Sequence, residues 1–278
     1  AGNTLSFRLA EACIEGEGLG GGSATDFFCL SLSAADYIGH LYGPDARETE
    51  DMYLRIDRDL AAFLDYLDRQ VGKGNYLFFL TADHGGAHNS DLLRERKIPA
   101  GNVNSLKMRA DLNEFIRAQW GIEKAVASAE NMQIYFREKK IRDAGVDREA
   151  LRQSVLEWLR DREEVAFAID LEHPERTPVP EPVQTAVVNG YHPVRSGSIQ
   201  FVLHPGWYNG YLPTGTTHGS WNPYDTHIPL IWYGWNMPKG ATSRTVYMTD
   251  IATTLSALLR LPRPNGCVGN VIVELVKD

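Results

Sequence analysis

The chain has 278 residues, of which 43% are hydrophobic and 23% charged, and its formal net charge at pH 7 is −8. This composition is typical of a globular protein, and the length suits one large α/β domain or two smaller ones. The negative charge argues against a nucleic-acid-binding surface, and no apolar run approaches the roughly 20 residues of a membrane span. The three cysteines are scattered and give no disulfide framework.

The N-terminal part of the chain predicts an alternation of helices and strands. A first helix is expected to end in the glycine-rich stretch 16–22, and a β-rich run predicts a central strand at 27–33. Hydrophobic residues at close to helical spacing predict a long helix at about 48–69. The apolar run 76–80 then predicts a buried strand. This order of elements is typical of a parallel sheet with right-handed crossovers.

The middle of the chain has a different pattern, which predicts a small α+β insertion over the main sheet. The expected helices and strands lie at 106–120, 133–136, 147–160, 165–171 and 198–203. The chain then returns to the core through a strand at 228–233 and a helix at 248–259. We therefore expect three parts, with core residues at 1–97, an inserted cap at 98–205 and a return to the core at 206–278.

Aspartate and histidine side chains border buried strands at three places. Asp83 and His84 follow a predicted strand, at the end where open α/β sheets bind ligands. Asp36 and His40 are four residues apart, so they share one face of a helical turn. His218 lies in a polar loop rich in glycine and threonine. The positions predict that the three places come together.

The five side chains offer nitrogen and oxygen ligands that suit a divalent metal such as zinc. Five ligands are more than one four-coordinate ion needs. They are one or two fewer than two metal sites need when each site also holds water or substrate. Two ions roughly 4 Å apart clamp a phosphoryl oxygen. Each residue alone also has an ordinary explanation as a turn cap or surface group. His88, near the site, is a candidate for an outer contact.

Three short segments, in this order, give the sequence a resemblance to a known family. They are Asp36-Tyr37-Ile38-Gly39-His40 followed by Gly43-Pro44, then Thr81-Ala82-Asp83-His84-Gly85, then Thr217-His218-Gly219-Ser220. Together they resemble the alkaline phosphatase superfamily, especially the bacterial alkaline phosphatases that share a branch with nucleotide pyrophosphatases/phosphodiesterases. The segments 224–230 and 265–267 are also similar. The resemblance implies an α/β fold with a doubly wound, mostly parallel sheet between helices and a small inserted cap.

The resemblance also implies a site and an activity. Asp36, His40 and His218 are expected to hold one zinc ion, and Asp83 and His84 are expected to hold a second. The implied reaction is hydrolysis of phosphate monoesters through a nucleophile, usually Thr in this branch, and a covalent phospho-enzyme. Family members place an Asn and often a Lys/Arg pair around the phosphate. The implied setting is periplasmic or secreted.

The sequence departs from the family pattern before its first motif. In the family the nucleophile and a further zinc-binding Asp lie upstream, and here Asp36 has only 35 residues before it. Thr4, Ser6 and Thr25 do not follow a strand as the nucleophile does. We therefore expect the C-terminal portion of a longer enzyme. Such a chain should hold at most one zinc ion firmly, lack the covalent route by itself, and self-associate through an exposed core edge.

Other functions remain open from the sequence. A phosphodiesterase or nucleotide pyrophosphatase on the same scaffold is the close alternative. An arylsulfatase is less favoured because its formylglycine motif is missing, and cofactor-independent phosphoglycerate mutase shares the scaffold but uses manganese. Two alternatives come from a different class of protein. One is a non-catalytic metal-binding or interaction module, and the other is an α/β domain without metal.

Overall fold

The structure, a computed structural model, describes residues 1–210 and 214–276. The chain divides into two compact units, each built from several segments. Unit 1 consists of residues 1–7, 30–59 and 82–228, and unit 2 consists of residues 8–29, 60–81 and 229–278. The expected part boundaries at 97 and 205 stay a prediction.

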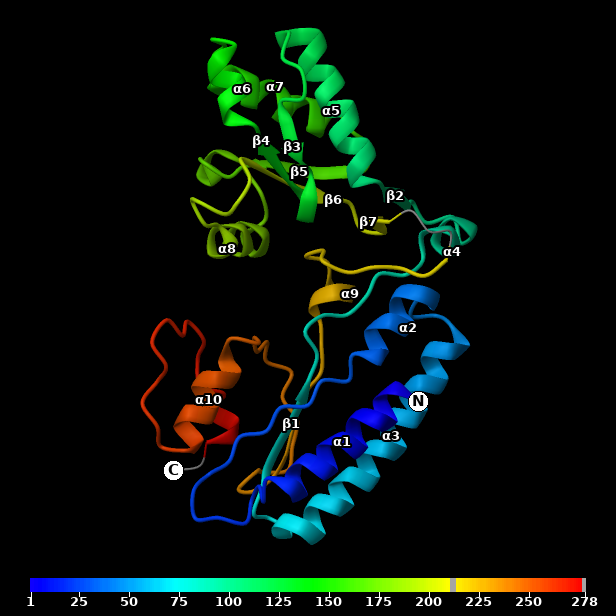
Figure 1. The fold of residues 1–278 in the computed structure, drawn as a ribbon, viewed down its shortest axis with the longest axis vertical. Helices are drawn as coiled ribbons and strands as arrows, with labels where there is room; N and C mark the ends of the chain where they lie inside the picture. Colours follow the sequence, from blue (N-terminus) through cyan, green and yellow to red (C-terminus); the bar gives the residue numbers. More distant parts are fainter. Residues whose placement is uncertain (211–213, 277–278) are drawn as a thin grey trace. The chain divides into compact units, whose positions relative to one another are not determined.

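The core of unit 1 is a four-stranded antiparallel sheet in the order β3-β4-β6-β5, covered by helices (Figure 1). The strands are β3 (Val126–Ser128), β4 (Gln133–Phe136), β5 (Val165–Asp170) and β6 (Ile199–Leu203). Helices α5 (Ser105–Trp120) and α7 (Arg148–Arg160) pack against them with fully buried side chains such as Leu112, Ile116 and Leu151. The helices and strands expected between 98 and 205 are therefore confirmed, with ends that differ by a residue or so.

Shorter elements complete unit 1. Helix α2 (Ala34–Tyr42) carries the first motif, and β2 (Gly101–Val103) pairs in parallel with β7 (Trp207–Asn209). The remaining elements are α4 (Ser90–Glu95), η2 (Glu130–Met132), α6 (Glu138–Asp143), η3 (Pro174–Arg176), α8 (Glu181–Gly190) and α9 (Pro223–Thr226). Asn89 caps α4, because its side chain accepts hydrogen bonds from the backbone of Asp91 and Leu92.

Unit 2 contains a two-stranded antiparallel sheet of β1 (Leu77–Thr81) and β8 (Leu230–Gly234). Phe79 lies opposite Trp232, and their rings stack with centroids 5.1 Å apart. The other elements are η1 (Asp68–Gly72), α10 (Asp250–Leu258) and η4 (Val273–Leu275). Helices α1 (Gly2–Gly16) and α3 (Arg47–Leu67) contribute residues to both units. The strands and helices expected at 76–80, 228–233, 48–69 and 248–259 are confirmed.

The strand expected at 27–33 is wrong for this chain. The segment has no strand conformation, and Phe27 is 69% exposed. A strand needs a neighbour that pairs with its backbone N–H and C=O groups, and in the described part of the chain no strand pairs with this segment. Its absence also removes one of the strands expected in the parallel sheet. As a result, β2–β7 is the one parallel pair among the described strands.

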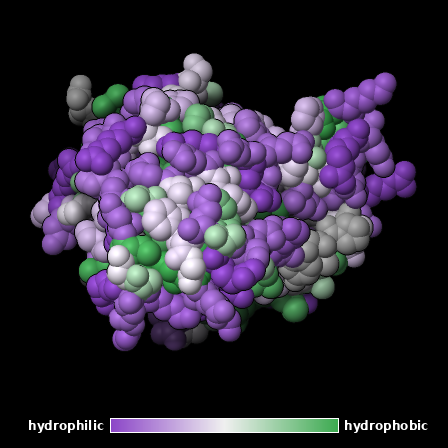
Figure 2. Space-filling model, turned by 90° about the horizontal axis from the view of Figure 1, so that it is seen from above, coloured by the Kyte–Doolittle hydropathy of each residue, from purple (hydrophilic) through white to green (hydrophobic). Residues whose placement is uncertain are grey.

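The face shown in Figure 2 consists mainly of hydrophilic residues, and hydrophobic residues form only small separate groups on it. Such a surface is ordinary for a globular protein. Among the helices of the described residues, none combines the length and the apolar character that crossing a lipid bilayer requires.

Candidate metal centre

Asp36, His40 and His218 lie together in unit 1. Each offers one ligand atom, and these atoms all lie within 4.8 Å of one another. The Oδ1 atom of Asp36 is 3.4 Å from Nε2 of His40 and 3.7 Å from Nε2 of His218. The structure therefore brings together the first expected ligand group, from two segments almost 180 residues apart in sequence.

Helix α2 and the loop before His218 fix the position of His40. Asp36 and His40 lie one turn apart on α2, so both point to one side of the helix. Nδ1 of His40 is 3.0 Å from the carbonyl oxygen of Thr216, which leaves Nε2 turned toward Asp36. A Cβ atom at Gly215 would lie 1.9 Å from the carbonyl oxygen of His40, and Gly215 also has φ +79°. Only glycine permits this approach.

His84 joins the same cluster from the turn after Asp83. Its Nδ1 is 2.8 Å from the carbonyl oxygen of Gly85, and its Nε2 is 3.8 Å from Oδ1 of Asp36. The backbone N–H of Gly85 donates to the carbonyl of Asp225 at 2.7 Å. A Cβ atom at Gly85 would lie 2.1 Å from the carbonyl oxygen of Tyr224. The glycine after His84 therefore allows two loops to pack closely.

Asp83 lies at the edge of this arrangement. Its side chain is 87% exposed, and its Oδ2 is 3.5 Å from Nε2 of His84. The rings of His84 and His218 stack with centroids 3.3 Å apart and planes 11° apart. Of the second expected ligand group, His84 therefore approaches the carboxylate of Asp36, whereas Asp83 contacts His84 alone among the ion pairs of the described residues.

His88 lies in the turn that follows the cluster residues. Its Nδ1 is 2.6 Å from Oδ2 of Asp45, so the structure pairs it with an acidic residue of the α2–α3 loop. The neighbouring Asn89 donates to the carbonyl of Gly215 at 2.8 Å and thereby supports the loop of His218. The outer contact expected of His88 with the ligand residues stays a prediction.

The electrostatics of the cluster favour a neutral His218. Burial lowers the pKa of the His218 imidazole, the nearby rings of His84 and His40 lower it further, and Asp36 and Asp225 act in the opposite direction. Neutral imidazole is the form of histidine that binds metal ions. The environment of His218 is therefore suited to a ligand.

The donor set fits a zinc ion. Two ligands at 2.0–2.2 Å from a tetrahedral ion are about 3.4 Å apart. The distances from Asp36 to His40 and His218, 3.4 and 3.7 Å, are close to this spacing. One carboxylate with imidazoles is also a donor set that zinc accepts.

The sequence prediction missed Asp225, which lies in α9. This aspartate is only 3% exposed, and its Oδ2 accepts a hydrogen bond from the backbone N–H of Ser220 at 2.7 Å. Its Oδ1 is buried without a hydrogen-bond partner among the described residues. The segment 224–230 contributed to the family resemblance but suggested no role for its members. The burial of this carboxylate and its contact with the loop of His218 are visible only in the structure.

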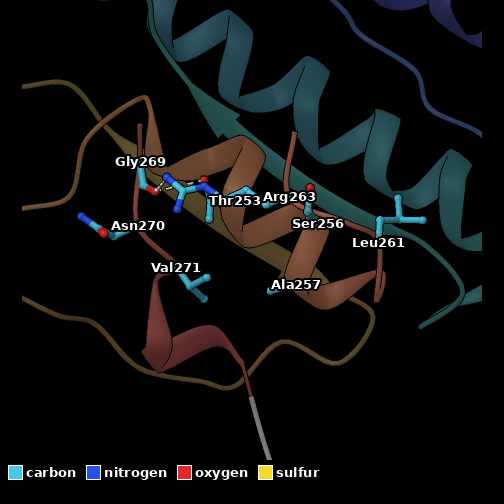
Figure 3. Close-up of a pocket in the computed structure, with 8 residues that line it drawn as sticks. All are labelled: Thr253, Ser256, Ala257, Leu261, Arg263, Gly269, Asn270 and Val271. Carbon is cyan, nitrogen blue, oxygen red and sulfur yellow. Dashed lines mark hydrogen bonds between the residues drawn. The ribbon is translucent and has the colours of Figure 1, made fainter. Parts of the chain in front are cut away.

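Unit 2 contains a separate cavity of ≈ 320 Å³ (Figure 3). Its lining includes Thr253, Arg263 and Asn270, and Arg263 donates a hydrogen bond to the carbonyl oxygen of Gly269. Its described lining residues include no carboxylate or imidazole. The ligand chemistry therefore points to the Asp36 cluster.

Comparison with known families gives one match that covers most of the chain. Residues 5–225 match the family described as type I phosphodiesterase/nucleotide pyrophosphatase. This range includes all five of the expected ligand residues.

Curated relatives, among them the following three, match nearly the whole chain. Alkaline phosphatase PafA from Elizabethkingia meningoseptica is 40% identical over 275 residues, which are 99% of this chain and 50% of the relative. A protein named calcium-transporting ATPase from Myroides odoratus is 41% identical over 100% of this chain and 51% of its own. Alkaline phosphatase PhoV from Synechococcus elongatus is 41% identical over 99% of this chain and 50% of its own.

The crystal structure of PafA superposes on this chain with a TM-score of 0.95 at 40% identity, over 99% of this chain and 52% of the PafA chain. This match confirms the expected alkaline-phosphatase-like α/β fold, in which the described strands of this chain form one parallel pair and otherwise antiparallel pairs. The chain spans about half the length of the curated relatives it matches.

Proposed function

Because the chain belongs to the type I phosphodiesterase/nucleotide pyrophosphatase family, we propose that it supplies zinc-binding residues to a phosphatase that hydrolyses phosphate monoesters. The observation that carries the proposal is the convergence of three imidazoles on one carboxylate, Asp36. The relatives named alkaline phosphatase support the choice of monoesters.

In the proposed centre, some residues of the chain would bind the metal ion and others orient the metal-binding side chains. Asp36, His40 and His218 would hold one zinc ion through Oδ1 and two Nε2 atoms. A bound zinc ion acts as a Lewis acid that polarises a phosphoryl oxygen. The Asp36 side chain is 43% exposed, so a substrate can approach the cluster from solvent. The carbonyl contacts of His40 and His84 hold their rings with Nε2 toward Asp36.

We extend the proposal to a second zinc ion, held by Asp83 and His84. Two protein ligands are fewer than the three that catalytic zinc sites usually have. The third ligand and the nucleophile that forms the covalent phospho-enzyme are proposed to come from residues outside this chain, so the chain alone is expected to be inactive. The match to only about half of each relative supports this view.

A chimera tests the function. The chain would replace the matched 52% of PafA, and hydrolysis of 4-nitrophenyl phosphate and of bis(4-nitrophenyl) phosphate would be measured. We expect zinc-dependent monoester hydrolysis that is lost in the His218→Ala chimera. A folded chimera that binds zinc and hydrolyses neither ester would contradict the proposal.

The same assay decides between the proposal and its alternatives. The family's description as phosphodiesterase/nucleotide pyrophosphatase favours a diesterase as the second candidate. Faster hydrolysis of the diester by the chimera would select that function. Zinc binding without hydrolysis of either ester would select a non-catalytic metal-binding module.

We also propose that the chain self-associates through the β1–β8 sheet. Ile231 and Tyr233 of β8 are 53% and 40% exposed. A short sheet with exposed apolar side chains tends to pair with another chain. Sedimentation of the wild type and of Ile231→Lys at several concentrations tests this, with a monomeric variant expected.

We further propose a periplasmic or secreted setting, based on the family. We also propose that the chain has no nucleic-acid-binding surface, based on its net charge of −8.

A further inference from the structure

Two of the three clustered histidines, His40 and His84, have a partner for the ring nitrogen that points away from Asp36. Nδ1 of His40 lies 3.0 Å from the carbonyl oxygen of Thr216, and Nδ1 of His84 lies 2.8 Å from that of Gly85. In metal sites, this second contact fixes the tautomer and the orientation of the ring. For His218, the described residues provide no hydrogen bond to Nδ1.

Asp225, in turn, has a buried carboxylate oxygen that lacks a hydrogen-bond donor within the described part of the chain. Its side chain is buried, Oδ2 is taken by the N–H of Ser220, and Oδ1 has no partner among the residues that the structure describes. A buried carboxylate oxygen without a partner is costly, so Oδ1 of Asp225 is expected to accept a hydrogen bond from a nearby donor. The charge of Asp225 also acts electrostatically on His218.

Asp225 is connected to both loops of the cluster. Its Oδ2 holds Ser220, which lies two residues after His218, and its carbonyl accepts the N–H of Gly85, which follows His84. One buried residue thus links the backbone on either side of the stacked rings of His84 and His218.

We propose that Asp225 is the positioning residue of His218. The two side chains, both of which the structure describes, form no ion pair within 4.0 Å, whereas His218 and Asp36 do. In the metal-loaded chain the His218 ring would donate its Nδ1–H to Oδ1 of Asp225, so that Nε2 is held toward Asp36. This inference rests on the proposed metal centre and goes beyond it, because it assigns a residue that contacts no metal. The Asp225 side chain acts through His218, because the contact with the His84 loop is made by the Asp225 backbone carbonyl, which side-chain variants keep.

The test is cobalt binding by the full chain, measured from the visible absorption of Co²⁺ and by competition with a chelator. Asp225→Asn keeps an oxygen for Ser220 but replaces Oδ1 with an amide donor, which cannot accept the Nδ1–H. We expect the Co²⁺ affinity to fall by about 10- to 100-fold and the absorption spectrum to change. Unchanged affinity and spectrum would overturn the inference.

Asp250→Asn is the matched control. Asp250 is also 3% exposed, and its two carboxylate oxygens accept backbone hydrogen bonds from Tyr247 and Asn270. This variant should lose stability without a change in Co²⁺ affinity. An equal loss of affinity in the two variants would mean that Asp225 acts only on stability, and it would overturn the inference.

A double-mutant comparison tests the route of the effect. In a His218→Ala background, Asp225→Asn should cause no further loss of the remaining Co²⁺ affinity, because its target ring is gone. The same fold loss in both backgrounds would overturn the inference. If the wild type binds no Co²⁺, the metal centre fails together with the inference, whereas normal binding by Asp225→Asn refutes the inference alone.

Nitrogen-15 NMR of the wild-type side chain gives a readout that requires no substitution at Asp225. The His218 ring, assigned by comparison with His218→Gln, should carry its proton on Nδ1 in the zinc-loaded chain. A ring with its proton on Nε2, or a freely exchanging Nδ1 proton, would overturn the inference.

Discussion

Gly215→Ala should damage both the stability of unit 1 and its metal affinity. The new Cβ atom would lie 1.9 Å from the carbonyl oxygen of His40 and 2.8 Å from that of Leu41, and contacts under 3.0 Å are essentially never seen. The loop and α2 would therefore have to separate by about 1 Å. Metal–ligand distances in proteins are kept within about 0.2 Å, so a displacement of this size would disturb a metal site. His40 is itself an expected ligand, so the displacement acts on the site directly.

The energetic cost has two parts. A non-glycine residue at this positive φ costs about 1–2 kcal/mol, and the overpacking costs about 1–3 kcal/mol more. Gly219→Ala is the matched control, because Gly219 has φ +101° but nothing within 4 Å of its added Cβ. The control should therefore lose only the first part.

Urea unfolding in the presence of a chelator would measure the free energy of unfolding of both variants. We expect Gly215→Ala to be less stable than Gly219→Ala by about 1–3 kcal/mol. Its zinc affinity should also be lower, by at least about tenfold. Equal stabilities and equal zinc affinities in the two variants would refute the close approach of Gly215 to α2.

Three further predictions concern the rest of the chain. Arg152 is 1% exposed and pairs with Asp170, Glu172 and Glu149, so Arg152→Ala should cost about 3–5 kcal/mol in urea unfolding. Arg117→Ala, which breaks an exposed pair with Glu114, should change stability by less than about 1 kcal/mol, and similar losses in both would argue against the buried network. The hydrogen bond from Arg244 lowers the pKa of Glu274 from 4.5 to about 2, so the stability that Glu274 adds over Glu274→Gln should be present above pH 4.5 and disappear as the pH falls toward 2. A difference that does not depend on pH in unfolding curves would contradict this. Trp221 packs against Phe167 and the Val183 cluster, so Trp221→Ala should cost about 3 kcal/mol and weaken zinc binding through the loop of His218, whereas wild-type values in calorimetry and zinc titration would be the contrary result.

The sequence predicted the elements whose pattern is local. Apolar residues at helical spacing located α3, α5 and α7, and apolar runs bounded by turn residues located β1 and β8. These elements succeed because one face or one short run decides where they lie. The expected strand at 27–33 failed because strand formation depends on a neighbour, which composition does not reveal.

The candidate site was predictable in its members but not in its arrangement. Position at strand ends and on a helical turn singled out Asp36, His40 and His218, which the structure brings together. The convergence of His84 on the same carboxylate depends on the packing of Gly85 against Tyr224, a tertiary contact. Asp225 was missed for the same reason, because its burial and its unpartnered oxygen have no signature in the sequence.

The zinc content of the purified chain tests the central claim most directly. Elemental analysis after loading with zinc and removal of excess should give about one firmly held ion per chain, through three protein ligands. Asp36→Ala and His218→Ala should each lose it, because both remove a member of the cluster. A folded wild-type chain without zinc, or variants that keep it, would contradict the proposed metal centre.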